Sequence, residues 1–305
     1  MNMMRNEKWR DVDAQARDQA QAVKLLAMDT STGMMTLALL ADGKPVAGYS
    51  SEAERNHSIQ LMPAIEELLR EYGLRPAQLD GIVVGKGPGS YTGVRIGISV
   101  AKTMAWALSV PVVAVSGLEA LALGAWRASG GTGGHDAAVG PVWYVPLFDA
   151  RRKQAFCAVY AFDREGRRNV VAGDGIRVVP DWTGSLLELA RGGSEGASVA
   201  SAASAASAAP SAVSRPSRIV FLGETAGFDT YLEAFGAAFA EGVVEVRPAG
   251  MDAVYVGELG WERWQRGELD EVHTLVPNYT QLAEAEVKLL QKEKEQGGDA
   301  NGGAC

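Results

Sequence analysis

Cysteine and histidine are both scarce in this chain: its 305 residues include two cysteines and three histidines. Cys157 lies in an apolar run and Cys305 ends a polar tail, so a disulfide between them is not expected and a reducing compartment is indicated. The histidines are His57, His135 and His273, and no two of them stand at the spacing of metal ligands. These two scarcities argue against a disulfide-stabilised secreted domain and against metal-dependent catalysis.

Long apolar runs are also missing. No stretch approaches the roughly 20 apolar residues that span a membrane, and residues 1–22 carry mixed charge without the apolar stretch of a signal peptide. We therefore expect a polar N-terminal extension, no membrane association and a cytoplasmic protein. The formal net charge of −8 argues against nonspecific attraction to nucleic acid, so a role near RNA would need a local basic patch or a basic partner.

Two common phosphate-binding signatures are absent. A Walker A loop would place Gly-Lys-Ser/Thr at its end, whereas Lys86 precedes the glycine-rich run here. The dinucleotide fingerprint is GxGxxG, whereas Gly87, Gly89 and Gly93 are spaced GxGxxxG, and no acidic residue follows about 20 positions later. Neither a P-loop ATPase nor a nicotinamide enzyme is supported.

The most informative segment that is present covers residues 81–117, which predict a buried strand, a glycine-rich turn, a helix and a second strand. In the turn, Ser90 and Thr92 can cap the helix, and the free N–H groups of the helix could hold an anion. The glycines Gly87, Gly89 and Gly93 allow a close approach of the backbone to a ligand. A tight turn without a ligand explains the same residues equally well.

The chain predicts two related halves. Residues 23–118 predict three strands in an antiparallel meander, a helix over 58–72, and the strand–helix–strand unit. Pro63 predicts a kink in that first helix or a later start. Residues 119–290 predict a second, degenerate copy, with strands at 141–148, 154–162, 170–179, 219–222 and 243–246 and helices at 230–240 and 251–266.

Two low-complexity stretches accompany this second half. Residues 191–218 are dominated by serine and alanine and predict a flexible insertion. Residues 291–305 are polar and predict a disordered tail.

With these segments in place, the chain resembles the TsaB (YeaZ) family. The resemblance is carried by MDTST at 28–32, NHSIQLMPAIEELL at 56–69, GKGPGSYTGVRIGISVAKTMA at 85–105 and LFDARRKQAF at 147–156. The closing segment, 277–286, matches less well, because Thr280 and Gln281 stand where leucine and arginine are usual. The resemblance implies an α/β, actin-like and ribonuclease-H-like (ASKHA) fold of two related lobes, with mixed sheets flanked by helices.

The resemblance also implies a function: TsaB belongs to the bacterial machinery that installs N6-threonylcarbamoyladenosine (t6A) beside the anticodon of tRNAs. It implies a noncatalytic subunit that pairs with its paralogue TsaD, the transferase, helps recruit the ATPase TsaE and tRNA, and forms homodimers when alone. No cofactor is firmly implied, although ATP or ADP with Mg²⁺ could occupy the interface of the complex. The alternatives are a stand-alone actin-fold phosphotransferase and a degenerate glycoprotease-like metallopeptidase.

The metal ligands of the relatives are absent from this sequence. Those relatives carry two histidines four positions apart in an HLEGH-like motif, and the corresponding positions here are Gly117, Leu118, Glu119, Ala120 and Leu121. Without an imidazole pair on one helical turn, the sequence predicts no metal site.

The turn formed by Asp29, Thr30, Ser31 and Thr32 has two interpretations. In the actin-like fold this turn faces the nucleotide phosphates and their metal ion. A hydrogen-bonded hairpin turn would favour the same residue types, because their side chains bond the nearby backbone.

The second helix carries small residues at every fourth position, at Gly93, Gly97, Ala101 and Ala105. Such a ridge either packs on the chain's own sheet or lets a partner helix approach closely. The resemblance favours an interface with TsaD, or with a second copy, formed by Ile59, Met62, Ile65, Leu69, Gly97, Ala101, Met104 and Ala105. Asp149, Arg151 and Arg152 resemble the family's DAR motif; a polar turn explains them equally well, although the arginines could contact phosphate or a carboxylate.

Overall fold

The computed structural model describes residues 22–52, 56–131, 141–163, 166–192 and 215–280. The predicted N-terminal extension up to residue 21, most of the predicted insertion (193–214) and the tail (291–305) lie outside the described residues, as does His135. Within the described part, no helix is long and apolar enough to cross a membrane.

The first sheet combines an antiparallel meander with two parallel strands, as the sequence predicts. Its order is β3-β2-β1-β4-β5. Two helices pack on one face, against the side chains of Leu26 and Met28. The elements are β1 (Lys24–Asp29), β2 (Met34–Ala41), β3 (Lys44–Glu52), α1 (His57–Tyr72), β4 (Gly81–Gly85), α2 (Tyr91–Leu108) and β5 (Val112–Val115), with a short 3-10 helix at Pro76–Gln78.

The second sheet repeats the path of the first. Its order is β10-β9-β6-β7-β8, so β6 takes the central place of β1, and β7 and β8 follow it as β2 and β3 follow β1. This repetition confirms the prediction of two related lobes. The elements are β6 (Val142–Asp149), β7 (Gln154–Phe162), β8 (Arg168–Val178), α4 (Val179–Ala190), β9 (Arg218–Gly223), α5 (Asp229–Ala238) and β10 (Val243–Pro248).

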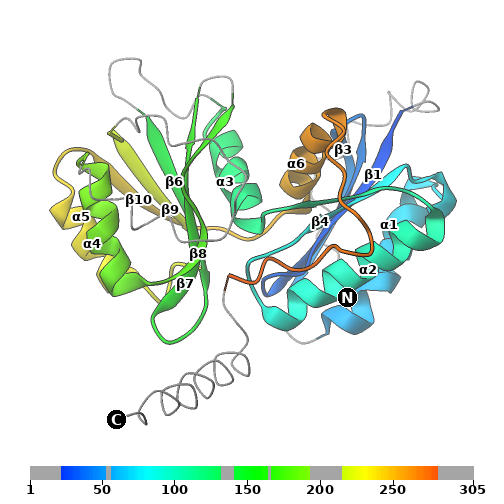
Figure 1. The fold of residues 1–305 in the computed structure, drawn as a ribbon, viewed down its shortest axis with the longest axis horizontal. Coiled ribbons are helices and arrows are strands. Elements are labelled where there is room, and N and C mark those ends of the chain that lie inside the picture. The colour runs from blue at the N-terminus through cyan, green and yellow to red at the C-terminus, as the bar shows by residue number, and fades with distance from the viewer. Residues whose placement is uncertain (1–21, 53–55, 132–140, 164–165, 193–214, 281–305) are drawn as a thin grey trace, which may run out of the picture.

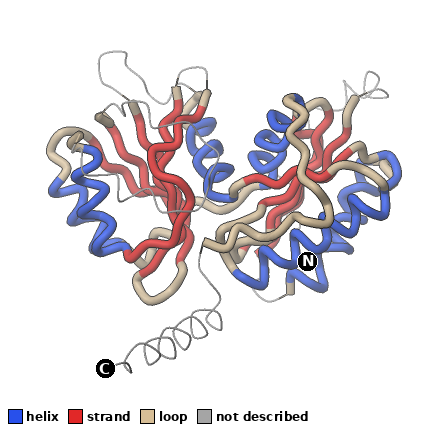
Figure 2. Tube along the Cα trace, viewed as in Figure 1, coloured by secondary structure: helices blue, strands red, loops and turns tan. Residues whose placement is uncertain are grey.

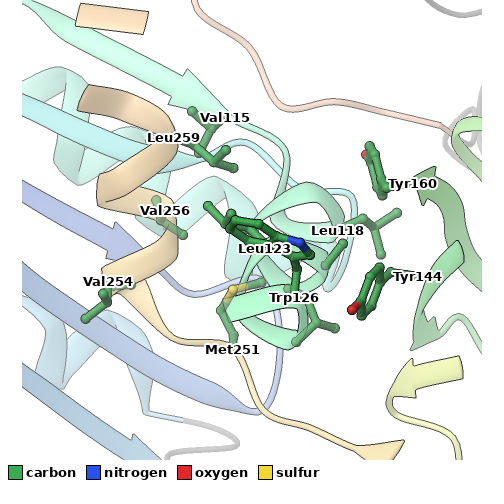
Figure 3. Packing of buried hydrophobic residues seen from close by; sticks show 14 of the residues in the cluster. Val115, Leu118, Leu123, Trp126, Tyr144, Tyr160, Met251, Val254, Val256 and Leu259 are labelled. Carbon is green, nitrogen blue, oxygen red and sulfur yellow. The ribbon is translucent and has the colours of Figure 1, made fainter. Parts of the chain in front are cut away.

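Two helices, α3 (Gly117–Ala128) and α6 (Ala253–Gln265), lie between the sheets (Figures 1 and 2). Helix α3 follows the last strand of the first sheet but packs on β6 and β7, whereas α6 follows the last strand of the second sheet and packs on β1 and β2. The chain therefore crosses between the lobes twice. The lobes share one apolar cluster as a result, in which Leu118 and Trp126 of α3 meet Tyr144 of β6 and Val256 of α6 (Figure 3).

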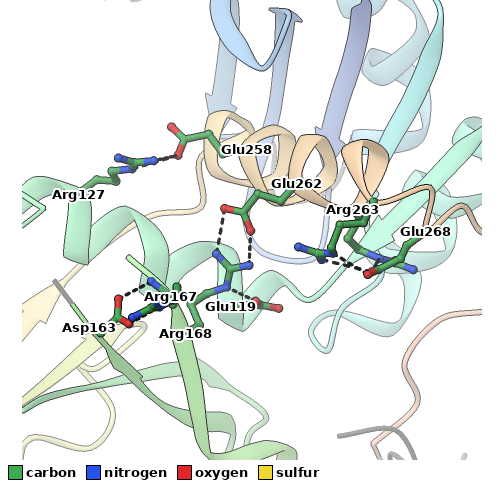
Figure 4. Close-up of polar contacts among 10 residues, drawn as sticks. Glu119, Arg127, Asp163, Arg167, Arg168, Glu258, Glu262, Arg263 and Glu268 are labelled. Carbon is green, nitrogen blue, oxygen red and sulfur yellow. Dashed lines mark hydrogen bonds and ion pairs between the residues drawn. The ribbon is translucent and has the colours of Figure 1, made fainter. Parts of the chain in front are cut away.

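An ion-pair cluster also joins α3 and α6, through β8. Arg168 at the start of β8 binds Glu119 on α3 and Glu262 on α6 (Figure 4). The Arg168 side chain is only 15% exposed, so its charge needs both carboxylates.

Helix α1 begins at His57 and continues through Pro63, so a later start is wrong. It ends where the sequence predicts, because Gly73 adopts a left-handed conformation (φ 77°) and its N–H bonds to the carbonyl of Arg70.

The small-residue ridge of α2 faces the chain's own sheet. Gly97 is buried, and Ala101 and Ala105 are 0% and 1% exposed. Together with Met104 they lie on the buried face of α2. On α1, Ile65 and Leu69 are likewise buried. The expectation that these residues are free for a partner is therefore corrected: a period of four marks a close-packed face, and the sheet occupies that face. Of the eight predicted interface residues, Ile59 and Met62 are exposed, at 73% and 49%.

Enlarging this ridge should destabilise the fold. We expect Ala101→Leu to lower the free energy of unfolding by about 1–3 kcal/mol, because the side chain has no room between α2 and the sheet. The matched variant Ser99→Leu, on the exposed face of the same helix, should stay within about 0.5 kcal/mol of the parent. Urea unfolding measures both, and equal effects would contradict this placement of the ridge.

Candidate functional site

The two loops singled out by the sequence lie against each other. The turn between β1 and β2 packs on the glycine-rich loop before α2: the Thr30 hydroxyl donates to the carbonyl oxygen of Gly93 at 2.7 Å, and the Ser90 N–H donates to that of Ser31 at 2.7 Å. Thr30, Ser31 and Thr32 are all buried. Two polar groups that could hold a phosphate, the Thr30 hydroxyl and the Ser90 N–H, are thus engaged in bonds between the loops.

This contact explains the spacing of the glycines. A Cβ atom on Gly89 would lie less than 3.0 Å from the Ser31 carbonyl oxygen, and one on Gly93 less than 3.0 Å from that of Thr30. On Gly97 it would lie 2.6 Å from the Thr30 hydroxyl. No larger residue fits unless the turn moves. Packing between the two loops is sufficient to require these glycines.

Ser90 caps α2, since its hydroxyl accepts the N–H of Gly93 at 3.2 Å. Thr92 lies exposed within the first turn of the helix. Gly87 joins the glycine-rich loop to the start of α3, because its carbonyl oxygen accepts the N–H of Gly117 at 3.1 Å.

Asp29 lies where these two loops meet, at the end of β1. It is fully buried, and its Oδ1 accepts both the N–H and the hydroxyl of Ser31 at 2.8 Å. Its Oδ2 has no hydrogen-bond partner among the described residues. Burial raises the pKa of Asp29 from its ordinary value of 3.8 to about 6, against the opposing effect of the two bonds from Ser31.

Of the two positions that correspond to the histidine pair expected in the relatives, Gly117 lies beside Asp29, and neither Gly117 nor Leu121 has a side chain that could bind a metal. A Cβ atom on Gly117 would be 3.7 Å from the Asp29 Oδ2 and 3.3 Å from the Met251 side chain. Leu118 and Leu121 are buried in the core that joins the lobes. The part of the chain that the structure describes holds no group of three or more His, Cys, Asp or Glu residues suited to a metal ion. This donor set does not fit a catalytic metal.

A second polar cluster was not predicted from the sequence. Asp174 on β8 accepts the hydroxyls of Ser116 and Tyr160 at 2.7 and 2.8 Å and the side-chain amide of Asn278 at 3.2 Å. Burial raises the pKa values of Asp174 and Tyr160. Because the partners are spread over 116–278, no local spacing could reveal them; only Asn278 lies in a segment with a family resemblance.

Four large apolar side chains are exposed on the outer helices of the first sheet. Ile59 and Met62 on α1 and Tyr91 and Trp106 on α2 are between 49% and 73% exposed. The guanidinium of Arg95 lies 3.8 Å from the centre of the Tyr91 ring. Tyr91 joins this set of side chains to the exposed part of the glycine-rich loop, whereas the turn that carries Asp29 is buried.

Comparisons with known proteins identify the family of this chain. A family model described as TsaD, tRNA N6-adenosine threonylcarbamoyltransferase, matches residues 50–289. The tRNA threonylcarbamoyladenosine biosynthesis protein TsaB of Bacillus subtilis is 33% identical over 273 residues, covering 88% of this chain and 99% of that protein. The chain belongs to the TsaB (YeaZ) family.

Further relatives agree with this membership. Escherichia coli TsaB is 33% identical over 144 residues, or 47% of this chain and 58% of that protein. The structure of YeaZ from Pseudomonas aeruginosa has a TM-score of 0.60 and 26% identity, covering 84% of this TsaB-family chain and 99% of that one. A tRNA N6-adenosine threonylcarbamoyltransferase of Anaeromyxobacter is also similar, at 33% identity over 113 residues, or 32% of this chain and 34% of that protein.

The raised pKa of Asp29 predicts a pH-dependent stability. The folded state holds the proton more tightly than the unfolded state, so ionisation of Asp29 lowers stability as the pH rises from about 4 to about 6. Asp29→Asn cannot ionise. We expect the stability of this variant relative to the parent to increase by on the order of 1 kcal/mol between pH 5 and pH 8. Urea unfolding at both pH values measures it; a difference independent of pH would mean that Asp29 is already ionised at pH 5.

Proposed function

We propose that this chain is the TsaB subunit of the machinery that synthesises t6A in tRNA. The proposal is supported by the likeness to Bacillus subtilis TsaB over 99% of that protein, and by the TsaD family model that matches residues 50–289. In this role the chain pairs with TsaD, helps recruit TsaE and tRNA, and works in the cytoplasm.

The noncatalytic part of the proposal rests on the residues at the start of α3, near Asp29, which cannot bind a metal. Gly117, next to the Asp29 carboxylate with its raised pKa, and the core residues Leu118 and Leu121 stand at the positions that correspond to the relatives' histidine motif. An ionised group there would need a cation to offset its burial. The chain supplies no second ligand at Gly117 or Leu121, so we assign the transfer reaction to TsaD.

Nucleotide binding between these two loops is not part of the proposal. The Thr30 hydroxyl and the Ser90 N–H already bond the facing loop, and Gly89 and Gly93 are covered by the β1–β2 turn. ATP or ADP with Mg²⁺ at the interface of the complex would therefore need groups supplied by the partner.

The exposed apolar side chains of α1 and α2 are the proposed docking surface for TsaD. The exposed side chains of Ile59, Met62 and Trp106 on two adjacent helices are suited to burial against another helical face. The same surface would pair two copies of the chain in the absence of TsaD.

A reconstituted reaction tests the function. It contains TsaD, TsaE, tRNA and threonylcarbamoyl-adenylate, with and without this chain, and t6A is measured in the digested tRNA. We expect modification to depend on the chain, and the chain alone to be inert. Equal modification without it would refute the assignment, and modification by the chain alone would refute its noncatalytic role.

The docking surface is tested by Ile59→Glu combined with Met62→Glu. Two charges on the exposed face of α1 should abolish pairing with TsaD in size-exclusion chromatography, because burial would desolvate unpaired carboxylates, while leaving the unfolding transition intact. Val243→Glu is the matched control, since Val243 is 52% exposed on β10 of the other lobe. Undiminished pairing by the double variant would refute this interface.

A further inference from the structure

The turn between β6 and β7 is the counterpart of the turn that carries Asp29. Asp149 ends the central strand β6 as Asp29 ends β1, and in each lobe four residues, 150–153 and 30–33, lead to the next strand. The same hydrogen bond shapes both turns: the N–H of Arg151 donates to the Asp149 Oδ1 at 2.8 Å, as that of Ser31 does to Asp29. The two turns therefore differ in their side chains and surroundings more than in their framework.

The second turn has an unusual backbone for its residues. Arg151, Arg152 and Lys153 all have positive φ values, of 69°, 53° and 62°. Such left-handed conformations cost free energy for every residue with a Cβ atom, and turns with this geometry favour glycine, asparagine or aspartate. Three successive basic residues occupy these positions instead, so the turn keeps cationic side chains at the expense of stability.

The acidic residues at this turn bond to its backbone. The Asp149 carboxylate accepts the Arg151 N–H, and the Glu224 carboxylate accepts the Asp149 N–H at 2.8 Å. Arg151 also lies 3.7 Å from Asp149, but its side chain is 87% exposed. Among the described residues, no ion pair is formed by Arg152 or Lys153, and both are exposed. The two carboxylates fix the shape of the turn while the three cations face solvent.

We propose that Arg151, Arg152 and Lys153 form a contact surface for the phosphate backbone of RNA. In a chain of net charge −8, an RNA contact requires a local basic patch, and this turn is one. The three basic residues are exposed on a turn between two strands. Exposed cations on a turn suit an extended polyanion better than a small phosphate ligand, which a pocket would enclose. The inference rests on the proposed function, which makes tRNA that RNA: the chain contributes a direct contact beyond its pairing with TsaD.

The test replaces all three residues with glycine, which adopts positive φ without strain. The triple variant removes three positive charges and also relieves the strain of the positive φ values, so the melting temperature should be unchanged or higher. Binding of a tRNA transcript to the complex with TsaD should weaken by at least about tenfold near 0.1 M salt, and the slope of log K against log salt should become shallower by about two. Arg152→Asn with Lys153→Asn, which keeps residues that tolerate this backbone, should show a smaller loss of the same kind.

The control is Lys44→Gln, which removes an exposed positive charge from the other lobe and should change the affinity by less than about twofold. Parent-like affinity and salt slope in the triple glycine variant would overturn the inference. Loss of pairing with TsaD or TsaE at unchanged tRNA affinity would also overturn it and would assign the turn to a protein partner. Loss of ATP binding alone would overturn it as well. The tRNA titration is also run on the chain by itself. A failure to pair with TsaD then counts against the proposed function, while the contribution of the turn to tRNA affinity is still measured.

Discussion

The contact between the β1–β2 turn and the start of α2 is the constraint on which the first lobe depends. Thr30 engages Gly93 through its hydroxyl and lies over Gly97, and the Ser31 carbonyl receives the N–H of Ser90. A helix can approach a turn this closely only where its facing residues lack side chains. The position of α2 then determines which residues cover Leu26 and Met28 and, through Gly87 and Gly117, where α3 begins. The glycine-rich motif is thus first of all a packing motif.

Much of this architecture could be predicted because it is encoded locally. Strand alternation, the glycine turn, the helical period of α1 and the stop at Gly73 each depend on a few neighbouring residues. The target of the α2 ridge could not be predicted, since a period of four identifies a close-packed face without identifying what packs on it. The Asp174 cluster and the return of α6 to the first sheet were missed for a similar reason. The partners of Asp174 lie 14, 58 and 104 positions away, and α6 packs on strands more than 200 positions before it.

The crossing of α3 and α6 bears on how the lobes can move. They share one apolar cluster, and Arg168 is held by a carboxylate from each of these helices. Separating the lobes would expose the cluster and leave a largely buried guanidinium without its partners, which is costly. A wide separation of the two lobes is therefore disfavoured.

The two equivalent turns, 30–33 and 150–153, share a backbone framework but differ in their side chains. The first carries hydroxyls, is buried under the glycine loop and leaves one carboxylate oxygen of Asp29 without a hydrogen-bond partner among the described residues. The second keeps the aspartate and its hydrogen bond to the backbone but displays cations on a left-handed backbone. Because both turns use one framework, the framework does not explain the basic residues. Nor does stability, since glycine would be favoured at those positions. Contact with an anion outside the chain, as in the proposed contact with the RNA phosphate backbone, would account for them.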